Sequence, residues 1–421
     1  MPTHTLAQLQ TKLKEVYLIE DRYIIKVLCA SVISHFLSND PAWIVFVASS
    51  GSAKSEFINL IHTITWTIQP TEADPKPEEQ RVHAMDALTA KTFISGQKIV
   101  GRDTSLLLQI KNGIITFPDL TLLLSENKDD LAVIMGQLRK IFDGSYSKSF
   151  GTGETLEWRG KITIIAGSTY AIHSMKQKYT SMGERFIFYN FIQPDGKEAA
   201  RRTMHNQEEG KMKEHRLELA GNTRDYIFDV LSHVPKDLIK ITDQQRENAI
   251  DLAEMATRAR SDVRRNWSSR EQEITEVDPP EAPTRFAGEL QAEMRGLMIQ
   301  NYHNFGRMEL IEEDEEVIAK FAFDSIPRSR CNAMIELAQY DILETSGIAT
   351  KIGLPTTSVR RSLEDLVALG IAEREKGSGP KGDKWLIKPE YRDLIMKYKN
   401  VKREGAELLG SSQAETGWDL G

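Results

Sequence analysis

The loop Ala48–Ser55, which reads Ala-Ser-Ser-Gly-Ser-Ala-Lys-Ser, has the residue types of a phosphate-binding loop. The apolar run Ala42–Val47 before it is typical of a buried strand, and a helix is predicted from Lys54 to about Thr67. At such a turn the backbone amides can cradle phosphates, and the start of the helix favours negative charge. Lys54 would reach the outer phosphates, and the Ser55 hydroxyl would bind Mg²⁺.

The loop departs from the strict phosphate-loop pattern, which has glycine at the positions of Ala48 and Ala53. A serine-rich turn that caps a helix, with Lys54 in solvent, is the structural alternative. If the loop binds a nucleotide, the expected ligands are ATP and Mg²⁺. The expected contacts then come from Ser50, Gly51, Ser52, Ala53, Lys54 and Ser55.

A second candidate metal ligand is Asp119, which follows a predicted strand that begins at Gly113. In P-loop ATPases an acid at this place in the chain holds the water shell of the magnesium ion. The next residue, Leu120, stands where such enzymes usually carry a glutamate as general base. Asp119 could also be a turn residue at a strand end. Another acid, Glu126 or Asp143, could serve as the base; hydrolysis could be slow; or ATP could act only as a structural switch.

The segment Gly51–Ser55 resembles the phosphate loop of the minichromosome maintenance (MCM) helicases, which also carry Ala before the Lys and Ser after it. The motif order resembles that of this AAA+ family from about Ala42 to Asp324. The resemblance implies a parallel α/β core followed by a helical lid. MCM proteins also have an N-terminal domain that binds single strands, and Met1–Asp40 is too short for such a domain. We therefore expect this protein to be a relative of the MCM proteins, from a mobile element or a plasmid.

Leu138–Gly151 precedes the predicted strand Lys161–Ala166 and resembles the hairpin before the sensor strand of MCM helicases and bacterial enhancer-binding activators. In the helicases this hairpin projects a lysine into the central pore. The resemblance therefore implies that Lys148 contacts DNA, and a solvated hairpin lysine is the alternative.

Three further residues take roles that the resemblance implies. An AAA+ sensor strand ends in a polar residue that contacts the γ-phosphate, which points to Thr169 or Ser168, although either could be a helix cap. Ser181–Phe186 resembles the arginine-finger segment, so Arg185 would stabilise the γ-phosphate of a neighbouring subunit; the alternative is an ion pair with Glu184. Glu281–Arg285 resembles the sensor-2 segment, in which Arg285 would reach the nucleotide; a plain helix start is the alternative.

Ile348–Leu363 has the pattern of a helix-turn-helix, with Gly353 ending the first helix and Thr356 or Thr357 expected to cap the second. Strand, wing and strand follow, so residues 328–389 resemble winged-helix regulators. Val359, Leu363 and Leu366 would face inward. The residues expected to contact DNA are Thr357, Ser358, Arg360 and Arg361 on the second helix and Lys376, Lys381 and Lys384 on the wing. Binding of a protein partner is the alternative.

The composition is that of an ordinary globular protein: 40% of the 421 residues are apolar and 27% are charged, with a net charge of −7. DNA contacts must therefore come from local basic patches. The two cysteines, Cys29 and Cys331, are expected to be buried thiols in a reducing compartment. We expect neither a signal peptide nor a membrane helix, because no apolar run reaches about 18 residues. A cytoplasmic protein with no membrane partner is predicted.

The predicted architecture is an α/β AAA+ P-loop core with a helical lid and a C-terminal winged helix-turn-helix. The predicted function is a DNA-associated ATPase of the helicase, helicase-loader or replication-initiator type, which forms a homo-oligomer, as a hexameric ring. The alternative is a nucleotide-gated DNA-binding regulator with little or no hydrolysis. The predicted domains are an N-terminal helical segment (1–40), the ATPase core (41–196), the lid (197–326), the DNA-binding domain (327–390) and a tail (391–421).

Overall fold

The structure is a computed structural model. It describes residues 4–406 apart from 69–77, 90, 96–97, 100–101, 104, 126, 152, 174–184, 193–194, 209–210, 236–238, 267–271 and 378–381.

The chain divides into two compact units, neither of which is continuous in sequence. The first comprises residues 1–176, 184–241 and 291–311, and the second comprises residues 177–183, 242–290 and 312–421. The predicted domain boundaries stay predictions. The division places residues 197–241 with the sheet, and it places residues 242–290 with the C-terminal helices.

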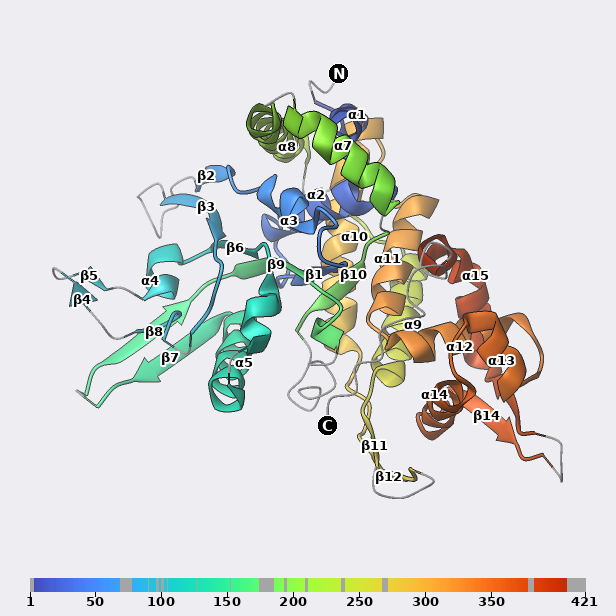
Figure 1. The fold of residues 1–421 in the computed structure, drawn as a ribbon. Coiled ribbons are helices and arrows are strands. Elements are labelled where there is room, and N and C mark those ends of the chain that lie inside the picture. Colours follow the sequence, from blue (N-terminus) through green and yellow to red (C-terminus); the bar gives the residue numbers. More distant parts are fainter. Residues whose placement is uncertain are drawn as a thin grey trace. The chain divides into compact units, whose positions relative to one another are not determined.

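The first unit is built on a six-stranded sheet with the order β10-β1-β9-β6-β3-β2 (Figure 1). Its strands are parallel except for β2, which pairs antiparallel with β3 at the edge. This mixed α/β arrangement is compatible with a P-loop-like core. The strands are β1 (Ile44–Val47), β2 (Thr65–Ile68), β3 (Glu78–Ala84), β6 (Gly113–Phe117), β9 (Ile162–Ser168) and β10 (Ile187–Asn190).

Helices cover both faces of this sheet, with α2 (Ile24–His35) and α3 (Lys54–Asn59) on one face and α5 (Lys128–Phe142) on the other (Figure 1). Side chains alternate between the two faces of a strand, so Trp43 and Phe46 point to opposite sides. The Trp43 ring lies 5.3 Å from the Phe142 ring of α5. On the other face, the His35 ring of α2 lies 2.9 Å from the Thr163 hydroxyl of β9. Both faces of the central strands are therefore buried, which accounts for their continuous apolar runs.

The three- and four-residue spacing of apolar residues over residues 6–37 predicts one helix, and this prediction is wrong, because the structure has two helices, α1 (Leu6–Val16) and α2. The buried carboxylate of Asp21 lies in the connection between them. It accepts hydrogen bonds from the backbone N–H of Tyr23 (3.0 Å), the hydroxyl of Tyr189 (2.7 Å) and the backbone N–H of Ile192 (2.9 Å). This connection is tied to the end of β10, and α7 (Gly196–Glu208) and α8 (Met212–His233) also belong to the first unit.

The helix after the phosphate loop is also shorter than predicted. It ends at Asn59 instead of continuing to Thr67, and residues 65–68 form β2. The register pairs Thr65 with Arg81 and Trp66 with Gln80 of β3. The β-branched residues of this segment suit a strand, and the partner strand decides the outcome.

Two hairpins and two short helical segments extend the first unit. The predicted hairpin is confirmed as β7 (Ser145–Ser149) and β8 (Thr155–Arg159), which pair antiparallel. β4 (Lys98–Ile99) and β5 (Arg102–Asp103) form a smaller ribbon before α4 (Leu106–Ile110). A 3₁₀ helix, η1 (Leu120–Ser125), follows β6 after Pro118 and Asp119.

The second unit begins with α9 (Asp243–Ala259) and an antiparallel hairpin of β11 (Val263–Arg265) and β12 (Ile274–Val277). The highly charged sequence over residues 197–270 predicts helix that includes Arg258, Arg264 and Arg265, but Arg264 and Arg265 lie on β11. α10 (Thr284–Phe305) follows, and the division between the units falls within it, after Leu290. α11 (Glu312–Asp324) then leads into the C-terminal helices.

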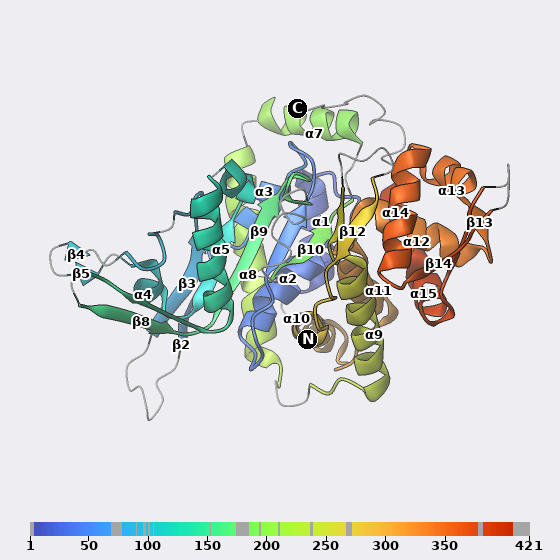
Figure 2. The ribbon, with the colours of Figure 1, turned by 90° about the horizontal axis from the view of Figure 1, so that it is seen from below.

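The C-terminal part of the second unit is a group of helices around a small antiparallel sheet with the order β13-β15-β14 (Figure 2). The predicted inward residues Val359, Leu363 and Leu366 are fully buried. The predicted threonine cap is wrong, because Pro355 is the N-cap and makes no side-chain cap hydrogen bond. The elements are α12 (Arg328–Gln339), β13 (Leu343–Glu344), α13 (Thr345–Ile352), α14 (Thr356–Ala368), β14 (Ala372–Glu375), β15 (Lys384–Ile387) and α15 (Pro389–Ala406).

Candidate functional site

The carboxyl ends of three neighbouring parallel strands meet at one edge of the sheet. Because β9 lies between β1 and β6, Val47 pairs with Ser168 and Phe117 pairs with Ala166. The backbone N–H of Ala48 donates to the carbonyl of Ser168 over 3.1 Å. The phosphate loop, the residues after Phe117 and the residues after Ser168 therefore leave the sheet side by side, where open α/β sheets bind their ligands.

Two residues of the phosphate loop have left-handed backbone conformations. Gly51 has a φ of 79° and Ala53 has a φ of 61°. Ala53 occupies the position at which the strict pattern has glycine, so the loop keeps the backbone shape that normally favours glycine. The next residue, Lys54, begins α3 and is only 5% exposed.

Asp119 is connected to the first turn of α3 and to the end of β9. The Ser55 hydroxyl donates to the carbonyl of Pro118 over 3.0 Å. The Asp119 carboxylate accepts the backbone N–H of Thr121 over 2.9 Å, as an aspartate does in an Asx turn. The Thr121 hydroxyl in turn accepts the backbone N–H of Thr169 over 3.4 Å. The structure thus brings Ser55, Asp119 and Thr169 together.

Thr121 was not predicted from the sequence as a site residue. Its hydroxyl lies 3.5 Å from that of Thr169, and it joins the loop after β6 to the loop after β9. The spacing of Asp119 and Thr121 is a sequence signal for an Asx turn, and it could have drawn attention to Thr121. The contact between Thr121 and Thr169 has no such signal, because it depends on the order of the strands.

Two buried hydroxyls at this edge have no hydrogen-bond partner within the described part of the chain. They are Ser52 Oγ in the loop and Ser168 Oγ at the end of β9. An unsatisfied buried hydroxyl is costly, so each is suited to a polar ligand. Lys54, these two hydroxyls and the strand-end Asp119 are together the kind of groups that could hold a nucleotide phosphate chain with its Mg²⁺.

Gly167 allows β9 and β6 to approach closely behind the site. A Cβ atom at this position would lie 2.5 Å from the Pro118 carbonyl oxygen and 3.0 Å from Ile58 Cδ1 of α3. The first of these contacts is closer than van der Waals packing allows. Glycine is therefore needed where Pro118, α3 and the sensor strand meet.

The first turn of α3 is held from outside by an ion pair. Arg216 of α8 makes two hydrogen bonds to the Glu56 carboxylate, from Nε over 2.8 Å and from Nη2 over 2.6 Å. The Tyr17 hydroxyl donates to the same carboxylate over 3.1 Å. Burial raises the pKa of Tyr17, and the charge of Glu56 raises it further, so this hydroxyl remains a donor. Neither Glu56 nor Arg216 was predicted, because their contact spans 160 positions in the sequence.

Arg185 and Asp143 lie at the amino-terminal edge of the sheet, away from the phosphate loop of their own chain. Trp43, which precedes β1, has its ring 5.3 Å from both Phe142 and Phe186. Arg185 Nη2 lies 3.5 Å from Asp143 Oδ1, and the Arg185 side chain is 11% exposed. Asp143 and Arg185 are therefore not brought together with Lys54, Asp119 and Thr169 of their own chain. Glu126 and Glu184, which also figure in the sequence predictions, lie outside the described residues.

Lys148 is half-buried on β7 and is bound to its own unit. Its ammonium donates to the carbonyl of Ile94 over 3.0 Å and lies 5.5 Å from the centroid of the Phe150 ring. A contact with DNA would require this lysine to leave the carbonyl of Ile94.

Arg285 lies in the first turn of α10, in the second unit, and pairs with Glu281. The Nη1 atom of Arg285 lies 2.5 Å from Glu281 Oε1. Arg260 binds the other oxygen of the same carboxylate over 3.0 Å. The Glu281 carboxylate, which belongs to the same unit, therefore holds the Arg285 guanidinium in position.

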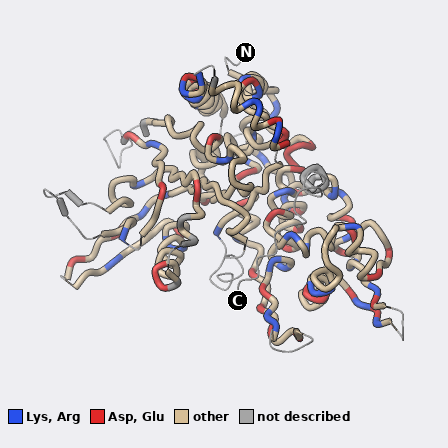
Figure 3. The backbone as a smooth tube through the Cα atoms, viewed as in Figure 1, with Lys and Arg blue, Asp and Glu red and all other residues tan. Residues whose placement is uncertain are grey.

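The predicted DNA-contacting residues of α14 are all at least partly exposed. Thr357 and Arg360 are exposed, and Ser358 and Arg361 are half-buried. Lys376 and Lys384 are exposed after β14 and on β15, whereas Lys381 lies outside the described residues. Basic and acidic residues are interspersed over the described chain (Figure 3). Positive charge therefore occurs in small local groups of residues, such as those on α14 and β15.

Within the described residues, no cluster of three or more His, Cys, Asp and Glu side chains could hold a metal ion. No described helix is long and apolar enough to cross a membrane. Cys29 and Cys331 are both buried free thiols, and burial raises the pKa of Cys29.

No protein-family model matches the chain, and no curated protein matches it. One similar solved structure is that of "SCCmec type IV Cch - active helicase". The similarity is distant: the sequences are 10% identical, the TM-score is 0.39, and the match covers 94% of this chain and 72% of that chain.

Proposed function

We propose that this protein binds Mg-ATP at the carboxyl edge of its sheet and couples the bound nucleotide to an action on DNA, as a helicase, a helicase loader or a replication initiator. The observation that carries the proposal is the position of β9 between β1 and β6. This strand order gathers Lys54, Asp119 and Thr169 from three separate segments of the chain.

Each residue at this edge has a role that follows from its chemistry. The loop amides of residues 50–55 and the Lys54 ammonium bind the phosphate oxygens. Ser55 and Asp119 would hold Mg²⁺ and its water shell, and the bound ion would supply neutralisation of phosphate charge. The Ser55 hydroxyl must then turn from the Pro118 carbonyl to the ion. Thr169 or Ser168 contacts the γ-phosphate.

A second function is favoured by the residue after Asp119. Leu120 is 5% exposed and has no acidic group, and Asp143 lies at the opposite edge of the sheet. Without a general base, hydrolysis would be slow, since such a group contributes about 10²–10⁴-fold to the rate. The alternative is therefore a nucleotide-gated DNA-binding regulator.

The proposed DNA contacts come from α14 and the β14–β15 hairpin, which we interpret as a winged helix-turn-helix. α13, the left-handed Gly353 (φ 67°) and α14 follow one another as this motif requires. Thr357, Ser358, Arg360 and Arg361 would face the major groove, and Lys376 and Lys381 would meet phosphates.

The proposed assembly is a homo-oligomeric ring, of six subunits by the resemblance to MCM helicases. Arg185 cannot reach the phosphate loop of its own chain, so a finger role requires a neighbour. For this role Arg185 must exchange its ion pair with Asp143 for the γ-phosphate of the neighbouring subunit. Arg285, which is paired with Glu281, would contact the nucleotide as a sensor-2 arginine.

The test is ATP hydrolysis and Mg-ATP binding by the wild type and by Lys54→Ala, each with and without duplex and single-stranded DNA. Turnover that DNA stimulates and Lys54→Ala abolishes supports the motor. Tight binding without turnover supports the regulator. Nucleotide binding that Lys54→Ala leaves unchanged would contradict both.

A further inference from the structure

The helix proposed to contact DNA carries two acids beside its arginines. Glu364 and Asp365 follow Arg360 and Arg361 by one turn of α14. The Glu364 carboxylate lies 3.0 Å from Arg360 Nε. Unneutralised carboxylates at this place would repel phosphates and would hold Arg360 away from them.

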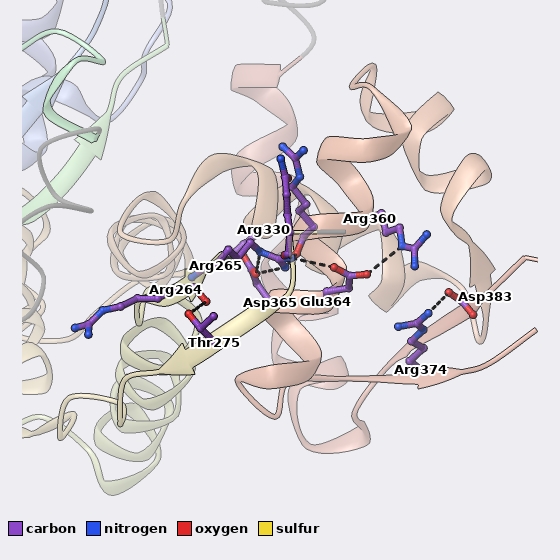
Figure 4. A network of polar contacts seen from close by, with 11 residues as sticks. Arg264, Arg265, Thr275, Arg330, Arg360, Glu364, Asp365, Arg374 and Asp383 are labelled. Carbon is purple, nitrogen blue, oxygen red and sulfur yellow. Dashed lines mark hydrogen bonds and ion pairs between the residues drawn. The ribbon is translucent and has the colours of Figure 1, made fainter. Parts of the chain in front are cut away.

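Arg265 forms ion pairs with both acids, although it lies on β11 and not on the C-terminal helices (Figure 4). Its Nη2 lies 2.6 Å from Asp365 Oδ1, and its Nη1 lies 3.1 Å from Glu364 Oε2. The same Nη2 donates to the backbone carbonyl of Arg361 over 3.1 Å. The Arg265 side chain is only 5% exposed, so it supports α14 from behind without facing solvent.

Arg330 of α12 completes the neutralisation of Asp365. Its Nη2 lies 2.9 Å from Asp365 Oδ2, and its Nη1 donates to the carbonyls of Ala259 (3.1 Å) and Ser261 (2.7 Å) at the end of α9. Asp365 therefore bridges two largely buried arginines. Removal of one partner of a buried ion pair is strongly destabilising, because the remaining charge is left without compensation.

We propose that Arg265 is a positioning residue for DNA binding: it neutralises Glu364 and Asp365 and fixes α14 so that Arg360 and Arg361 present positive charge. The inference rests on the proposed DNA-binding function of α14. It adds the β11–β12 hairpin, which comes before α10 in the chain, to the residues that determine DNA affinity. It also means that α14 is fastened to the end of α9 rather than attached by a flexible linker.

The test measures binding of the full chain to a fluorescent DNA duplex by anisotropy. Arg265→Gln is expected to lower the affinity about tenfold, because Glu364 and Asp365 then share one buried arginine fewer, which leaves uncompensated negative charge next to the phosphates. The triple variant Arg265→Gln, Glu364→Gln, Asp365→Asn is expected to restore most of this loss, since it removes the charges that Arg265 neutralises. A purely structural role for Arg265 predicts no such recovery.

Arg264→Gln is the matched control. Arg264 is the neighbour of Arg265 on β11, but it pairs with Glu276 and Asp278 of its own hairpin region, and its side chain is 48% exposed. Its loss is expected to leave the DNA affinity within about twofold of the wild type, as a surface ion pair contributes little. A loss as large as that of Arg265→Gln would overturn the specific role of Arg265.

If Arg265→Gln does not fold, Glu364→Gln alone tests the inference. It keeps both arginines on Asp365 and removes one negative charge beside Arg360, so the affinity is expected to rise several-fold. An unchanged or lower affinity would overturn the inference, as would wild-type binding by a folded Arg265→Gln. If Arg360→Gln with Arg361→Gln has no effect on DNA binding, the proposed function of α14 fails, whatever Arg265 does.

Discussion

The hydroxyl of Ser55 donates a hydrogen bond of 3.0 Å to the carbonyl of Pro118, which joins the first turn of α3 to the residue before Asp119. Residues 63 positions apart in the sequence are thereby adjacent. Ser55 is a proposed magnesium ligand, and Pro118 directly precedes Asp119, the other proposed ligand. The proposed site is a property of two strand ends held together, rather than of the phosphate loop alone.

Replacement of Ser55 by alanine is expected to remove most of the effect of Mg²⁺ on ATP affinity, about tenfold, because the ion loses a protein oxygen. Ser55→Thr keeps the hydroxyl and should retain the effect. Titration of a fluorescent ATP analogue with Mg²⁺ and with EDTA measures both. A Ser55→Ala variant with the full response to Mg²⁺ would show that the hydroxyl does not contact the ion.

The left-handed backbone of Ala53 predicts opposite results for two substitutions. Ala53→Gly removes strain but adds backbone freedom to the unfolded chain, so the free energy of unfolding should change by less than about 1 kcal/mol and ATP binding should persist. Ala53→Val places a β-branched residue at a φ of 61° and should weaken ATP binding at least about tenfold. Urea unfolding with nucleotide titration checks both, and equal affinities for the two variants would contradict the proposed loop geometry.

Gly167→Ala should separate β9 from Pro118 and α3. The added methyl group would lie 2.5 Å from the Pro118 carbonyl oxygen, so we expect a loss of about 1–3 kcal/mol in unfolding free energy and weaker nucleotide binding. Gly221→Ala in α8 is the control, since nothing lies within 4 Å of its added Cβ. That substitution should stabilise the helix by up to about 1 kcal/mol. Similar effects of the two substitutions would refute the close approach at Gly167.

The buried Glu293 predicts a pH dependence of stability. Burial raises its pKa from 4.5 to about 8, although hydrogen bonds from Ser31 and Ser34 oppose the rise. The folded state therefore keeps a proton that the unfolded state loses. The contribution of Glu293 to stability is complete below pH 4.5 and is lost as the pH rises towards 8.

Glu293→Gln should remove this dependence, because the amide does not titrate. Between pH 5 and pH 8 the unfolding free energy of the variant relative to the wild type should increase by at most about 1.4 kcal/mol per pH unit. Chemical unfolding at a series of pH values measures the difference. A difference that is constant with pH would contradict the raised pKa of Glu293.

Several features of this protein follow from local sequence alone. The apolar run before Ala48, the strand before Asp119, the hairpin after Phe142 and the spacing of Val359, Leu363 and Leu366 are all short-range patterns, and the structure has the corresponding elements. Side-chain periodicity and turn residues act within one or two turns or strands, which is why these elements could be predicted.

Only the tertiary structure decided which of these elements became neighbours. The insertion of β9 between β1 and β6 placed Thr121 against Thr169, and the contacts of Asp21 with β10 broke the predicted N-terminal helix in two. Arg265 binds Asp365 across 100 positions, and no periodicity in either segment points to the other. Local propensity determines an element, whereas strand order and buried ion pairs depend on how the whole core packs, and a single sequence contains no local signal for them.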